Sequence, residues 1–92
     1  MHDWTFLDIK YCWLEKKCVL RFKNRNSEIE EVCGNGVTLL NIPHQEEWGP
    51  SVSVNEITLS TINNKVNKLR VEMQSGDIIT IQAINFSGIK NN

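Results

Sequence analysis

Residues 69–83 decide the fold class of this chain, and they read Leu69-Arg70-Val71-Glu72-Met73-Gln74-Ser75-Gly76-Asp77-Ile78-Ile79-Thr80-Ile81-Gln82-Ala83. Apolar side chains take every second position on both sides of Ser75-Gly76-Asp77, with polar side chains between most of them. Alternation with a period of two predicts β-strands that bury one face. The central residues predict a three-residue hairpin turn. The resulting register pairs Met73 with Ile79, Val71 with Ile81 and Leu69 with Ala83.

The N-terminal part of the chain shows the same alternation. Ile9, Tyr11 and Trp13 share one face of a predicted strand, and the pattern resumes at Cys18, Leu20 and Phe22. A two-residue turn at Glu15-Lys16 places all of these side chains on one face, whereas a slip of one residue separates them. This second predicted hairpin pairs Trp13 with Cys18, Tyr11 with Leu20 and Ile9 with Phe22.

The middle of the chain carries further turn signals. Asn35-Gly36 is the strongest of them, because both positions tolerate a positive φ, and it predicts a hairpin between strands at 27–33 and 37–42. Residues 62–65, Ile62-Asn63-Asn64-Lys65, predict another turn. Val54 and Ile57 have opposite parity, so a β-bulge at Asn55-Glu56 is needed to keep both on the core side.

These patterns predict an all-β fold, an antiparallel meander of about seven strands that forms a sandwich or a partly open barrel. No segment keeps the 3.6-residue apolar period of a stable helix. We expect residues 1–92 to form a single β domain that frays at 1–3 and 87–92. The predicted core consists of Leu7, Ile9, Tyr11, Trp13, Leu20, Phe22, Leu39, Val52, Val54, Leu59, Leu69, Val71, Met73, Ile79 and Ile81.

Composition excludes several classes of function. The 92 residues carry a formal net charge of −1, so no overall field attracts nucleic acid. The chain shows neither the pattern of a signal peptide nor an apolar run long enough to cross a membrane, and we expect a cytoplasmic protein without a membrane partner. Three cysteines, Cys12, Cys18 and Cys33, are expected to be reduced thiols, since their spacing does not match a zinc site.

The long connection from residue 43 to residue 55 holds the candidate binding residues, which are His44, Glu46, Glu47, Trp48 and Asn55. A histidine beside carboxylates suits acid–base catalysis or a partial metal site. A second interpretation is a polar surface loop that is anchored by a buried Trp48 and has no catalytic or metal-binding role. A third interpretation is a loop that binds a partner or ligand. We expect no catalytic residue, no metal and no cofactor.

Two motifs carry a resemblance. Trp48-Gly49-Pro50-Ser51-Val52-Ser53-Val54-Asn55 and Glu72-Met73-Gln74-Ser75-Gly76-Asp77 resemble a small family of uncharacterised bacterial β-domain proteins. Some similar small proteins are immunity proteins of polymorphic toxin systems. The resemblance implies a compact β-domain that binds another protein, and it assigns no catalytic residue.

The sequence therefore favours a non-enzymatic protein-interaction module, of immunity type if the resemblance holds. The alternative is a small-ligand or carbohydrate-binding β-module with Trp48 and Trp4 as stacking surfaces. A small enzyme that uses His44 and Glu47 is less favoured. A homodimer is compatible with each of these, because strand edges and the outward-facing Ile78 and Ile84 need cover.

Overall fold

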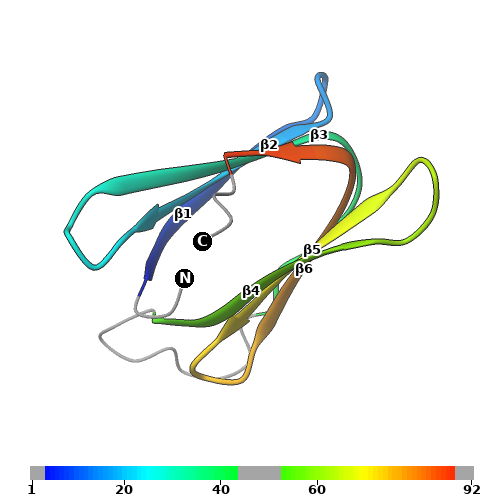
Figure 1. The fold of residues 1–92 in the computed structure, drawn as a ribbon. Coiled ribbons are helices and arrows are strands. Elements are labelled where there is room, and N and C mark those ends of the chain that lie inside the picture. The colour runs from blue at the N-terminus through cyan, green and yellow to red at the C-terminus, as the bar shows by residue number, and fades with distance from the viewer. Residues whose placement is uncertain (1–3, 44–52, 89–92) are drawn as a thin grey trace.

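A computed structural model describes residues 4–43 and 53–88 of the chain (Figure 1). All six strands pair antiparallel in one sheet with the order β1-β2-β3-β6-β5-β4, and the described residues contain no helix. The all-β antiparallel prediction is therefore confirmed, with six strands in place of about seven. The strands are β1 (Thr5–Cys12), β2 (Lys17–Lys23), β3 (Ile29–Asn41), β4 (Val54–Thr61), β5 (Asn67–Met73) and β6 (Ile78–Ser87).

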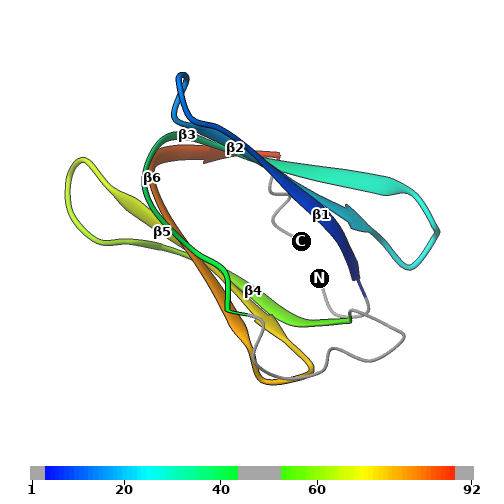
Figure 2. The same cartoon turned by 180° about the vertical axis from the view of Figure 1, so that it is seen from behind.

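The single sheet folds over itself. β3 and β6 are the longest strands, with 13 and 10 residues, and they lie next to each other at its centre. Both bend sharply midway, so that β1 and β2 form one layer and β4 and β5 lie in the other (Figures 1 and 2). The apolar faces of the two layers then enclose the core, which is how one sheet buries a face without a second sheet or a helix.

Gly36 lies at the bend in β3, and the prediction of a hairpin turn at Asn35-Gly36 was wrong. Gly36 has a φ of 67° inside the continuous strand, and the ladder to β6 shifts between Val37 and Leu39. A Cβ at Gly36 would approach the Cδ1 atom of Ile84 to 2.6 Å. A glycine inside a strand marks a tight bend or close approach, so two predicted strands are one bent strand.

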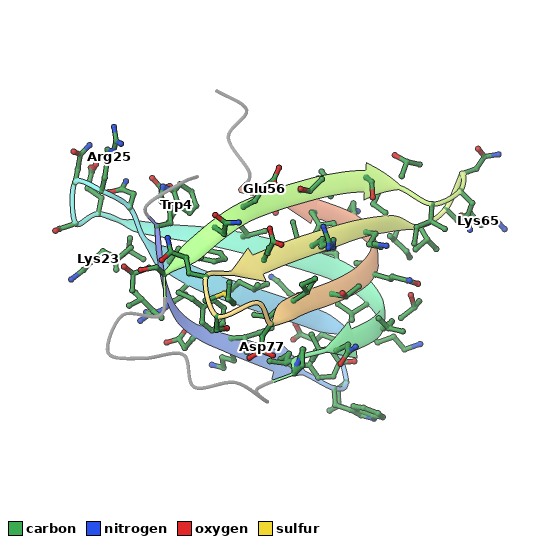
Figure 3. All side chains as sticks on the ribbon, turned by 90° about the horizontal axis from the view of Figure 1, so that it is seen from below. Trp4, Lys23, Arg25, Glu56, Lys65 and Asp77 are labelled. Atoms are coloured by element: carbon green, nitrogen blue, oxygen red, sulfur yellow. The ribbon has the colours of Figure 1, made fainter. Side chains whose placement is uncertain are left out.

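The fold is a partly open barrel, because the outermost strands meet at one end only. Thr5 forms an isolated antiparallel bridge with Ser53, and the Val54 amide donates to the Trp4 carbonyl at 2.8 Å. Among the described strands, β1 and β4 make no further pairing on their outer sides. Figure 3 shows Trp4 at one end of the folded sheet and Lys65 at the other.

Thirteen buried apolar residues form the core between the layers: Phe6, Cys18, Leu20, Phe22, Val32, Val37, Val54, Leu69, Val71, Met73, Ile79, Ile81 and Ala83. An aromatic cluster lies near the bridge between the edges. The ring of Phe22 lies 5.5 Å from that of Phe6 and 5.6 Å from that of Trp4, measured between centroids. Such clusters add specific edge and tilted contacts to the area that they bury.

Four predicted core residues are exposed instead, namely Leu7, Trp13, Leu39 and Leu59. A register shift around Leu7 lets Phe6 face Phe22 in the core, so Leu7 turns away. Trp13 lies in the turn after β1. Leu39 follows the shift in β3 and pairs with Gln82 on the outer face, while Leu59 is 47% exposed because β4 is an edge strand. Of the other predicted core residues, Ile9 and Tyr11 are half-buried against the core and Val52 lies outside the described residues.

Both predicted hairpin registers were wrong by two residues, and a shift of two leaves the side chains on their predicted faces except Leu7, at the bulge, and Trp13, in the turn. Tyr11 pairs with Cys18, so the first turn has four residues, 13–16, and Val71 pairs with Ile79, which centres the second turn on Ser75. In the second turn the Met73 amide donates to the Asp77 carbonyl at 2.9 Å, and Asp77 is buried. The predicted bulge was right, since the ladder between β4 and β5 shifts between Val54 and Glu56.

Gly36→Ala should destabilise the fold by about 1–3 kcal/mol, because alanine adds left-handed backbone strain and a clash with Ile84. Gly76→Ala is the matched control, since Gly76 also has a positive φ but no atom within 4 Å of an added Cβ. Urea unfolding measures both free energies. Adding Ile84→Ala to Gly36→Ala should recover the steric part of the loss. Equal losses at both glycines would contradict a close approach at the bend.

Candidate functional site

The predicted binding loop is represented in the described structure by its two ends. His44, Glu46, Glu47 and Trp48 lie outside the described residues, so their role stays a prediction. Asn55 lies at the bulge that begins β4, and its amide Nδ2 donates to Glu72 Oε2 at 3.0 Å. Asn55 therefore links β4 to β5, a contact that accounts for an asparagine at this position without a ligand.

Side chains that commonly bind metals do not cluster within residues 4–43 and 53–88. No group of three or more His, Cys, Asp or Glu side chains in these segments is arranged to hold a metal ion. The ion pair between Arg21 Nε and Asp8 Oδ1, at 3.1 Å, lies on the exposed outer face of β1 and β2. Pairs of this kind contribute little to stability. The described segments also contain no helix long and apolar enough to cross a membrane.

The most exposed large apolar side chains gather at the turn between β1 and β2. Trp13 is 80% exposed and Leu14 is 93% exposed. This hairpin projects beyond the body of the folded sheet (Figures 1 and 2). A tryptophan beside a leucine in water is costly unless a partner covers both, and such pairs are typical of binding surfaces. We call residues 11–17 the hairpin tip.

Hydrogen bonds and a ring contact hold the hairpin tip in place. The Lys16 amide donates to the Trp13 carbonyl at 3.4 Å, and Lys16 adopts a positive φ of 51° that closes the four-residue turn. The Val37 amide donates to the Lys16 carbonyl at 2.8 Å, which ties the turn to β3. Trp13 also lies edge-on to Tyr11, with 5.9 Å between ring centroids. A held aromatic side chain loses little further entropy when a partner binds.

An open depression of about 280 Å³ lies at the base of the hairpin tip, lined by Lys10, Cys12, Glu15, Lys17 and Val19. With Lys16, this region has three lysines against one glutamate. The electrostatic character of the tip is therefore positive, although the whole chain has a net charge of −1. A surface of this kind complements an acidic rim on a partner.

The prediction missed this surface because it assigned Trp13 to the core. One signal in the sequence marks the error. Leu14 follows Trp13 directly, so in a regular strand the two side chains point to opposite faces. A two-residue turn at Glu15-Lys16 therefore buries Trp13 only by leaving Leu14 exposed at the strand end.

Comparison with protein-family models, with curated proteins and with solved structures finds no match to this chain.

The cysteines differ in their surroundings. All three are free, with Cys12 exposed at the base of the hairpin tip, Cys33 half-buried and Cys18 buried. Burial raises the pKa of the Cys18 thiol above its ordinary value of 9.0; a backbone hydrogen bond to Gly34 opposes this effect, and Cys33 adds to it. Cys18 therefore stays protonated and behaves as an apolar core side chain.

An aromatic disulfide reagent at neutral pH should modify Cys12 rapidly and Cys18 only after unfolding, since the thiolate is the reactive species. Intact-mass measurement over time, with Cys12→Ser as the control, separates the two sites. Equal labelling rates at Cys12 and Cys18 in the folded protein would contradict this assignment.

The free energy of unfolding should also fall as pH rises above about 9, because the unfolded chain loses the Cys18 proton at a lower pH than the folded chain.

Proposed function

We propose that this chain is a non-enzymatic protein-interaction module that binds its partner through the hairpin tip. The observation that carries the proposal is the joint exposure of Trp13 and Leu14, at 80% and 93%, on a turn held by backbone hydrogen bonds. Tryptophan is among the residue types most enriched at the energetic centre of interfaces. A partner that buries both side chains removes from water the largest exposed apolar side chains of this hairpin.

The chemistry of the tip describes the partner. Trp13 and Leu14 fit an apolar pocket, and Lys10, Lys16 and Lys17 on the same hairpin favour acidic residues near that pocket. We therefore infer a protein with a negatively charged surface around a hydrophobic recess. An immunity-type role, in which that protein is a toxin, is one form of this proposal, and it rests on the resemblance of residues 48–55 and 72–77.

Trp13→Ala combined with Leu14→Ala should weaken partner binding by roughly 30-fold or more, since interface hot spots lose about 2 kcal/mol or more on truncation. Proteins retained by the immobilised wild-type chain are identified by mass spectrometry, purified and titrated calorimetrically against each variant. Ile29→Ala is the control, because Ile29 is also large and 51% exposed but pairs with Lys23 at the other end of β2. It should leave the affinity unchanged.

Two results would argue against the proposal. An unchanged affinity in the double variant, with the fold intact by circular dichroism, would move the contact away from the tip. Failure to retain any protein, together with a glycan that quenches Trp13 fluorescence, would favour the carbohydrate-binding alternative. In that alternative Trp13 supplies the stacking face, because Trp4 packs against Phe22 in the core.

A further inference from the structure

The two outer edges of the sheet differ in how well they accept another strand. β1 carries a register shift between Phe6 and Asp8, and its exposed positions include the charged residues Asp8 and Lys10. Bulges and charges are the means by which natural sheets block pairing at an edge. The β1 edge is therefore protected from other strands.

The β4 edge lacks such protection beyond its first residues. Its bulge lies at Asn55, and from Ile57 to Thr61 the ladder to β5 is regular. These five residues, Ile57-Thr58-Leu59-Ser60-Thr61, include no charge and no proline. Their β-branched residues favour strand pairing, and a regular uncharged edge of this kind is a template for a further strand.

The inward face of β4 is also incompletely covered. Ile57 pairs with the buried Val71, and Leu59 pairs with the buried Leu69, so both face the core side of the sheet. Burial nevertheless decreases along the strand: Val54 is fully buried, Ile57 is half-buried and Leu59 is 47% exposed. A strand added outside β4 would cover Leu59 and extend the apolar face.

We propose that a second copy of this chain adds to the β4 edge, and that β4 pairs antiparallel with β4 of the other copy about a two-fold axis at Thr58. The segment matches itself in this register. Ile57 lies opposite Leu59 of the second copy, Thr58 lies opposite Thr58, and Glu56 lies opposite Ser60. No two like charges face each other, and the row Val71, Ile57, Leu59, Leu69 runs across the interface as apolar contacts.

Symmetry makes this contact self-limiting. Pairing of β4 with β4 is isologous and closes after two copies, whereas pairing of β4 with β1 of the next copy would continue into a filament. The bulge and charges of β1 oppose that second mode. The β1–β2 hairpin is absent from this interface, so a dimer would present two hairpin tips. This inference is independent of the proposed partner of the tip.

Thr58→Glu should convert the dimer to a monomer, because it sets two carboxylates opposite each other at the axis. Within one chain the new carboxylate lies opposite Arg70, so folding should not suffer. Thr80→Glu is the matched control, since Thr80 also lies opposite Arg70 but on β6, inside the sheet. Sedimentation velocity should show the wild type and Thr80→Glu at twice the chain mass of 10.6 kDa. The dissociation constant of Thr58→Glu should rise by about tenfold or more.

Cysteine cross-linking tests the register. In a Cys12→Ser background, Thr58→Cys should form a disulfide-linked dimer as added oxidised glutathione is reduced to two thiols. Thr61→Cys should not, because the proposed register separates the two copies of residue 61. A wild-type chain that sediments as a monomer up to millimolar concentration would overturn the proposal. A dimer that survives Thr58→Glu, or cross-links at residue 61 and not at residue 58, would also overturn it.

Discussion

The structure depends on one constraint, which is that a single sheet with one apolar face must fold over itself to remove that face from water. The long central strands β3 and β6 meet this constraint by bending together (Figure 1). Gly36 permits the bend, because its φ of 67° and its contact with Ile84 leave no place for a Cβ. The closure between the outermost strands, at Thr5 and Ser53, follows from the bend, since it brings the start of β1 to the start of β4.

The folded sheet has two edge strands, β1 and β4, and their exposed sides differ in character. β1 ends in the hairpin tip with Trp13 and Leu14, and its edge is interrupted by a bulge and charges. β4 is regular and uncharged from Ile57 to Thr61. A protruding apolar turn suits a pocket on a different protein, whereas a bare edge suits another strand. Under our two proposals the surfaces serve different contacts, and two tips on one dimer would raise the avidity for a multivalent partner.

The face on which each strand residue lies was mostly predictable from the sequence, but the pairing register between strands was not. A period of two assigns faces from residue type alone, and it placed Leu20, Phe22, Leu69, Val71 and Ile79 correctly in the core. A shift of two residues keeps all faces, so apolar patterning does not separate a two-residue turn from a four-residue turn. The positive φ of Lys16 closes the four-residue first turn, and the hydrogen bond from the Met73 amide to the Asp77 carbonyl closes the second. The loop residues proposed for binding, His44 to Trp48, remain a prediction from sequence.

Side-chain alternation was enough to predict the class of the fold, its antiparallel strands, the bulge at Asn55 and most of the core, because alternation in a strand follows burial directly. That Asn35-Gly36 is a bend inside one strand depends on long-range pairing. The same dipeptide suits a turn or a bend, and the choice depends on whether β6 lies alongside to continue the ladder. The exposure of Trp13 also depends on tertiary pairing, because the register that sets Phe6 opposite Phe22 and Cys12 opposite Lys17 leaves Trp13 in the turn and in solvent.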